Sequence, residues 1–102
     1  MDSLLSQDHT GIKRFLALDS RAYRDGALDS KTKELLGLVT SIVLRCQECI
    51  THHAENCLQE GWSRDELLDA FNVAMVVGGS ITIPHIRELG EDIEQAMAGP
   101  DE

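Results

Sequence analysis

The sequence predicts an all-α protein, a compact bundle of about five helices within a single domain that spans residues 1–102. With 42% hydrophobic and 26% charged residues, the chain has the composition of a globular protein with a packed core. Apolar residues recur at helical spacing in several segments, and glycine, proline or capping residues separate these segments. The core must be mostly aliphatic, which favours packed helices, because only four residues are aromatic: Phe15, Tyr23, Trp62 and Phe71.

The first two helices follow from apolar periodicity. A short first helix ends near the turn signal at residues 24–26, and its apolar stripe consists of Ile12, Phe15, Leu16 and Leu18. The second helix begins at Asp29 or Ser30, because either side chain can accept a backbone N–H as an N-cap. It continues as far as Leu44, with apolar residues at helical spacing: Leu35, Leu36, Leu38, Val39, Ile42 and Val43.

The other three helices follow from capping signals. Residues from about Cys46 to Glu60 suit a helix, with Gly61 where a left-handed C-terminal cap is expected. The capping box at residues 63–66 starts a fourth helix that the glycine pair at residues 78–79 ends. The fifth helix accommodates Pro84 in its first turn and runs to residues 99–100, with this apolar stripe: Ile86, Leu89, Ile93 and Met97.

The fourth helix is apolar all round over more than one turn, because residues 73–77 are consecutive apolar residues. Such a helix has to be buried on every side, which a chain of this length achieves with difficulty. We therefore expect a homo-oligomer in which partner subunits complete the burial. The alternative is a central core helix in a monomer.

Charge and the absence of leader or membrane signals narrow the partners and the compartment. Nine Lys and Arg against eighteen Asp and Glu give a formal net charge of −9, with no basic stripe. Repulsion therefore excludes nucleic acid and disfavours an anionic membrane. Residues 1–10 do not resemble a secretory signal, and residues 73–77 are too few to cross a bilayer. We expect a cytoplasmic protein. In that reducing compartment, closely spaced cysteines are more often catalytic or metal-binding than structural.

Four side chains with reactive or proton-transferring groups share one face of the third helix: Cys46, Cys49, His53 and Cys57. Cys46 and Cys49 lie one turn apart at a helix start, where a disulfide can form and where the helix dipole stabilises a thiolate. His53, one turn after Cys49, can remove its proton, and Arg45 adds positive charge. An attacking thiolate, a base and a resolving thiol are the parts of a thiol–disulfide redox site.

Two other interpretations use the same residues. A zinc-binding or assembly module would draw on these ligands: Cys46, Cys49, His53 and either His52 or Cys57. Zinc fingers, however, usually split their ligand pairs between two elements, and no second pair exists here. Alternatively the cysteines are buried and inert, as we expect for Cys57, two turns beyond Cys49. Attached c-type haem is excluded because Ile50, and not histidine, follows the second cysteine.

Glu34 becomes a candidate through the predicted hairpin. If the second helix turns back near Arg45, Glu34 lies opposite roughly residues 55–58 of the third helix and can reach His53. A carboxylate there would orient the imidazole and raise its basicity. The alternative is an exposed glutamate in the first turn of a helix.

A family resemblance covers about residues 28–90. Glu34, eleven residues, then Cys46-Gln47-Glu48-Cys49-Ile50-Thr51-His52-His53, followed by Gly61 and Gly78-Gly79, resembles the carboxymuconolactone decarboxylase and alkylhydroperoxidase D-like superfamily. The resemblance implies an all-helical fold, assembly into trimers or hexamers, and peroxidase or disulfide-reductase activity. It also implies those catalytic roles for four residues: Glu34, Cys46, Cys49 and His53.

The resemblance makes the activity more specific. The paired cysteines point to the redox branch, which reduces hydroperoxides with electrons from a dithiol or redox protein, and we expect no cofactor. Cys49 is the expected attacking thiolate and Cys46 the resolving one, although the order could be reversed. Glu48 stands where the best-known peroxidase members have a histidine. A lactone decarboxylase using His53 and Glu34 for proton transfer remains an alternative, and we keep His85 outside the catalytic set.

Overall fold

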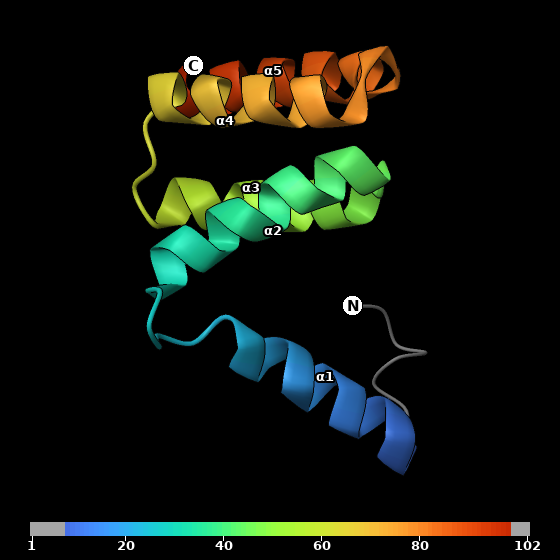
Figure 1. The fold of residues 1–102 in the computed structure, drawn as a ribbon. Coiled ribbons are helices and arrows are strands. Elements are labelled where there is room, and N and C mark those ends of the chain that lie inside the picture. Colours follow the sequence, from blue (N-terminus) through green and yellow to red (C-terminus); the bar gives the residue numbers. More distant parts are fainter. Residues whose placement is uncertain (1–7, 99–102) are drawn as a thin grey trace. The chain divides into compact units, whose positions relative to one another are not determined.

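The computed structural model describes residues 8–98, and this part of the chain is helical, without a strand (Figure 1). Its elements are α1 (Thr10–Ala22), α2 (Ser30–Leu44), α3 (Gln47–Gln59), α4 (Arg64–Gly78), the 3₁₀ turn η1 (Ser80–Thr82) and α5 (Ile83–Ala98). The all-α prediction is therefore confirmed. Residues 1–7 of the segment 1–10, which is not expected to be a secretory signal, and the predicted helix end at residues 99–100 lie outside the described residues.

The chain divides into two compact units, residues 1–33 and residues 34–102, and the single domain stays a prediction. In the first unit, the His9 side chain caps α1 by accepting the N–H of Ile12 at 3.2 Å. Asp29 caps α2, because its Oδ1 accepts the N–H of Thr32 at 2.8 Å. Hydrogen bonds from the side chain and backbone of Thr32 hold the pKa of the Asp29 carboxyl below its ordinary value.

The turn between α2 and α3 is a Schellman motif built on an arginine. Arg45 adopts φ 59°, its N–H bonds to the carbonyl of Ile42, and the N–H of Cys46 bonds to the carbonyl of Ser41. The left-handed conformation costs a residue other than glycine about 1–2 kcal/mol. The helical hairpin predicted from the sequence does turn back at Arg45, and the chain enters α3 at Cys46.

Local signals set the end of α3 and both ends of α4, as predicted. Gly61 follows α3 with φ 94°, and the capping box is complete: the Ser63 Oγ accepts the Glu66 N–H while the Glu66 carboxylate accepts the Ser63 N–H. Gly79 caps α4 with φ 84°. Gly78 lets Thr82 pack closely against the end of α4, since a Cβ at residue 78 would lie 2.6 Å from Cγ2 of Thr82. The η1 turn that contains Thr82 was not predicted.

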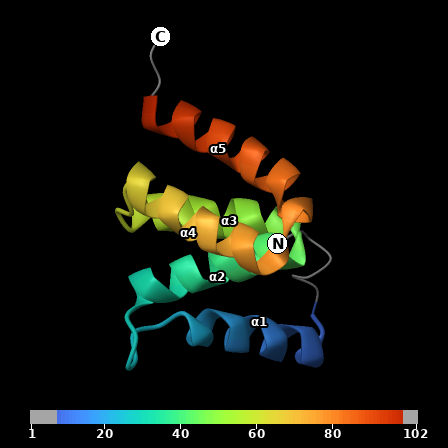
Figure 2. The same ribbon diagram turned by 45° about the horizontal axis from the view of Figure 1, so that its top comes forward.

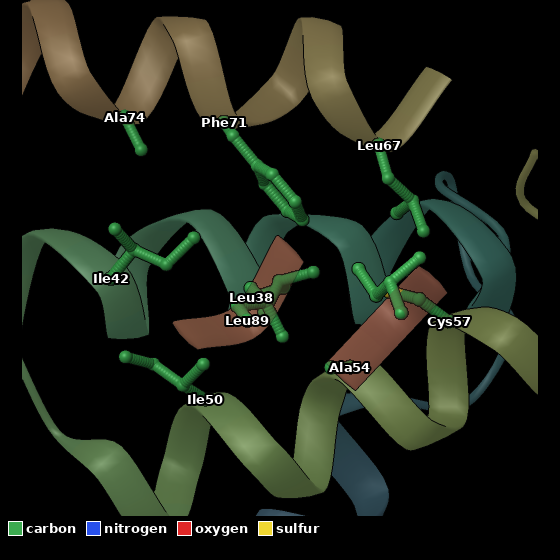
Figure 3. Close-up of a cluster of buried hydrophobic side chains, with 10 residues drawn as sticks. Leu38, Ile42, Ile50, Ala54, Cys57, Leu67, Phe71, Ala74 and Leu89 are labelled. Atoms are coloured by element: carbon green, nitrogen blue, oxygen red, sulfur yellow. The ribbon is translucent and has the colours of Figure 1, made fainter. Parts of the chain in front are cut away.

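The core of the second unit lies among α2, α3, α4 and α5. In the view of Figure 2, α3 and α4 lie between α2 and α5. Figure 3 shows Leu67, Phe71 and Ala74 pointing from α4 toward α2 and α3. Burying a side chain such as Phe71 contributes about 1.5–3 kcal/mol. The buried hydrophobic residues are Leu38, Ile42, Ile50, Ala54, Cys57, Leu67, Phe71, Ala74, Leu89 and Ile93. This mainly aliphatic core holds α2 against α3, which positions the residues described next.

The apolar run of α4 is only partly buried within one chain. Ala74 is fully buried, whereas Val73, Val76 and Val77 are 55%, 77% and 69% exposed. Among residues 8–98, burial of this helix on every side, as expected from the sequence, is therefore not achieved.

Candidate active site

Cys46 and Cys49 form a disulfide at the beginning of α3. Cys46 is the N-cap residue, with extended backbone angles of φ −94° and ψ 99°, and its Sγ accepts the N–H of Cys49 at 3.3 Å. The two Cα atoms are 5.3 Å apart, within the usual range for bridged cysteines. Cys46 is half-buried and Cys49 is exposed. The pairing predicted from the spacing is present, and Cys49 is the more exposed residue of the pair.

Glu34 of α2 and His53 of α3 are hydrogen-bonded across the hairpin, as the sequence predicted. The Nδ1 atom of His53 lies 2.9 Å from Oε1 of Glu34, and their side chains are only 12% and 11% exposed. A carboxylate oxygen accepts, so the Nδ1 atom of His53 donates. In a neutral imidazole the Nε2 atom then carries the lone pair that can accept a proton.

Asn56 is a further member of this network that the sequence analysis missed. Its Nδ2 atom donates to Oε1 of Glu34 at 3.2 Å and lies 3.4 Å from Nε2 of His52. Asn56 falls within residues 55–58, which the hairpin geometry places opposite Glu34, but nothing in the sequence indicates that its amide faces Glu34. Two donors on one carboxylate oxygen fix the orientation of Glu34.

The predicted stripe of α3 runs from solvent into the core. Cys49 is exposed, His53 is nearly buried one turn later, and Cys57 is fully buried and lies among the core side chains (Figure 3). Burial, with a smaller effect of Glu34 and Glu60, raises the pKa of the Cys57 thiol to about 12. The sequence-based interpretation of Cys57 as a small buried residue is confirmed, since a thiol of that pKa is protonated at neutral pH.

The raised pKa of Cys57 predicts a loss of stability in alkaline solution. Above the ordinary pKa of 9.0 the unfolded chain releases the thiol proton while the folded chain retains it, so stability falls as pH rises from 9.0 toward 12. The expected loss between pH 7 and pH 10 is on the order of 1 kcal/mol larger for the wild type than for Cys57→Ala. Urea unfolding under reducing conditions measures it, and equal losses in both proteins would contradict the prediction.

The charged neighbours of the disulfide lie at the surface. Glu48, between the two cysteines, is exposed. Water therefore screens the repulsion between its carboxylate and a thiolate at Cys49. Arg45 is also exposed and directly precedes Cys46. On the other side, His85 of α5 bonds to Gln47, the first residue of α3, with 2.8 Å between Nδ1 and Oε1. This contact joins two residues that the sequence analysis did not connect.

Across residues 8–98, no group of three or more His, Cys, Asp or Glu side chains is arranged to hold a metal ion. A groove of about 260 Å³ is lined by residues of α4 and α5, and it includes none of the four predicted site residues. No helix in the part of the chain that the structure describes is long and apolar enough to cross a membrane.

Fold and site together define an all-α protein with a cysteine pair at disulfide distance on a helix N-terminus and a Glu–His pair on the adjoining helical hairpin. The chain belongs to the carboxymuconolactone decarboxylase family, whose model matches residues 12–92.

Solved relatives share this fold. A carboxymuconolactone decarboxylase family protein of Thermotoga maritima, TM1620, for which involvement in an antioxidative response has been suggested, is 47% identical with a TM-score of 0.83. That match covers 92% of this chain and 100% of the other. The family protein lpg0406 of Legionella pneumophila is 32% identical, with a TM-score of 0.76, over 82% of this chain and 75% of that one.

A curated relative is longer than this chain. Uncharacterized protein 4 in the cox locus of Paracoccus denitrificans is 32% identical over 71 residues, which are 70% of this chain and 64% of that protein. The match therefore spans less than two thirds of that relative.

Proposed function

We propose that the protein is a thiol-dependent antioxidant oxidoreductase that reduces hydroperoxides by cycling Cys46 and Cys49 between dithiol and disulfide. The observation that carries this proposal is the cysteine pair at the start of α3 together with the Glu34–His53 hydrogen bond on the same hairpin. The suggested antioxidative role of the Thermotoga maritima relative agrees with it.

Oxidation of the cysteine pair to the disulfide takes place in two proposed steps. His53 takes the thiol proton of Cys49, and the thiolate attacks the outer peroxide oxygen, which breaks the O–O bond and leaves a sulfenic acid. The alkoxide that departs takes up the proton and becomes an alcohol. The Cys46 thiol then condenses with the sulfenic acid, so that a disulfide forms and water leaves.

Reduction completes the cycle. A dithiol or a redox protein attacks the disulfide, becomes oxidised itself, and returns two electrons and two protons to Cys46 and Cys49. Cys49 is the more exposed residue of the pair, so we expect such a donor to attack its sulfur. We place this chemistry in the cytoplasm, where dithiol donors keep thiols reduced.

Counting thiols tests the proposal. The reduced chain contains three cysteines, and one equivalent of cumene hydroperoxide is expected to remove two titratable thiols, leaving Cys57, which reacts only after unfolding. With excess dithiothreitol the same mixture should consume hydroperoxide catalytically. A full set of three thiols after the dose, or no turnover, would refute the proposal.

The same experiments separate the alternatives. A family lactone decarboxylase would convert its lactone even when both cysteines are replaced by serine. A zinc module would contain stoichiometric zinc after purification without chelator, with Cys46 and Cys49 protected from thiol reagents. Neither outcome is expected of a dithiol peroxidase.

We also propose that the protein assembles into a trimer or hexamer through the exposed valines of α4. Val76, which is 77% exposed, is expected to lie in the subunit contact, so Val76→Lys should shift the assembly to smaller species. Light scattering after size exclusion measures this, with Gln59→Lys, at an exposed position of α3, as the matched control. A wild-type protein with the mass of one chain would contradict the prediction.

A further inference from the structure

The hydrogen bond between His85 and Gln47 connects the first turn of α5 to the first turn of α3. The two residues are 38 positions apart, their side chains are half-buried, and Nδ1 of His85 lies 2.8 Å from Oε1 of Gln47. An amide oxygen only accepts, so the Nδ1 atom of His85 carries the hydrogen. Either the Nδ1–H tautomer or the imidazolium of His85 satisfies this bond.

Gln47 occupies a position that matters for the sulfur of Cys46. It is the first residue of α3 and directly follows Cys46, whose extended backbone lets Sγ accept the N–H of Cys49 at 3.3 Å. The peptide unit between Cys46 and Gln47 therefore helps decide where this sulfur lies relative to the helix. A bond that holds Gln47 to another helix restrains that peptide unit.

We propose that His85 is a positioning residue of the redox pair. Through Gln47, it holds the first turn of α3 so that the Cys46 and Cys49 thiols stay within bonding reach after reduction. An intramolecular disulfide forms more favourably when its two thiols have a high effective concentration, and this concentration falls when the segment carrying them moves more freely. The inference rests on the proposed function only in requiring that the pair cycles between dithiol and disulfide.

The thiol–disulfide equilibrium against dithiothreitol tests the inference without any peroxide. In this exchange dithiothreitol closes to its cyclic disulfide and passes two electrons and two protons to Cys46 and Cys49. His85→Phe, which removes the donor, is expected to shift the equilibrium about threefold to tenfold toward the protein dithiol. At 29.6 mV per tenfold change, the shift corresponds to about 14–30 mV.

Companion variants distinguish positioning from general destabilisation. Gln47→Leu is expected to give the same shift, and the double variant no more than either single change, because both remove one bond. His85→Asn places an amide N–H where the Nδ1–H lies and should restore the wild-type equilibrium. Gln59→Leu makes the same chemical change at an exposed position near the other end of α3 and should have no effect. Circular dichroism and urea unfolding establish that each variant is folded.

An unshifted equilibrium in folded His85→Phe and Gln47→Leu would overturn the inference, as would additive effects or a His85→Asn variant that behaves like His85→Phe. These outcomes are independent of the proposed peroxidase activity. A wild type that turns over hydroperoxide while His85→Phe keeps the wild-type equilibrium would leave the function standing and remove only the role of His85.

Discussion

Cys49→Ser is expected to lower hydroperoxide turnover by about three orders of magnitude or more, because a hydroxyl cannot replace the attacking thiolate. The exposure of Cys49 and the position of His53 one turn later on α3 support this assignment. Steady-state consumption of cumene hydroperoxide with dithiothreitol measures the loss. Cys57→Ala, which removes a thiol buried in the core, is the matched control and should retain activity.

The Cys46→Ser variant separates the attack on the hydroperoxide from the resolution of the sulfenic acid by the second thiol. If Cys49 attacks first, this variant should still reduce one hydroperoxide per chain and stop at a sulfenic acid, since no second thiol can condense with it. A reagent that captures sulfenic acids, followed by mass measurement, detects this product on Cys49. Full turnover in Cys49→Ser would refute the assignment, and a single turnover in Cys49→Ser with none in Cys46→Ser would reverse the order of the two cysteines.

Glu34→Gln is expected to lower kcat/KM for thiol oxidation by about 10- to 100-fold. The amide keeps the shape of the side chain and can still accept from Nδ1 of His53, but it lacks the charge that stabilises the protonated imidazole. The reaction of reduced protein with hydroperoxide, followed across pH, measures the effect. The loss should be greatest near neutral pH and smaller in alkaline solution, where hydroxide removes the thiol proton.

The control for this prediction is Glu55→Gln, which makes the same change at an exposed position of α3. Wild-type rates in Glu34→Gln would show that the Glu34–His53 bond serves packing alone. An equal loss in both variants would show that the rate responds to net charge and not to this hydrogen bond.

Most helix boundaries could be predicted from the sequence because their causes are local. The capping box at Ser63 and Glu66 and the left-handed Gly61 and Gly79 involve residues within a few positions of one another. The η1 turn was missed because residues 80–82 have no distinctive pattern. Arg45 was predicted as a turn from the flanking helices, but its left-handed conformation was not, since glycine usually occupies such a position.

Contacts between distant residues were predicted only where a hairpin brings them together. Glu34 and His53 are 19 positions apart but belong to adjacent helices, so counting residues around the turn was enough to pair them. His85 and Gln47 belong to helices separated by a third, and no residue count places them side by side. Asn56 lay in the expected window, but the sequence did not show that its amide would face Glu34.

The identity and order of the helices, and the meeting of Cys46 and Cys49, follow from the sequence alone, because helical periodicity, caps and a three-residue spacing act within one or two turns. Packing of α2, α3, α4 and α5 was needed to leave Cys49 exposed and to bury the thiol of Cys57 in the core. It also enclosed the Glu34–His53 pair and brought His85 to the start of α3. Burial depends on which helices cover a given face, and the pattern of a single helix does not contain that information.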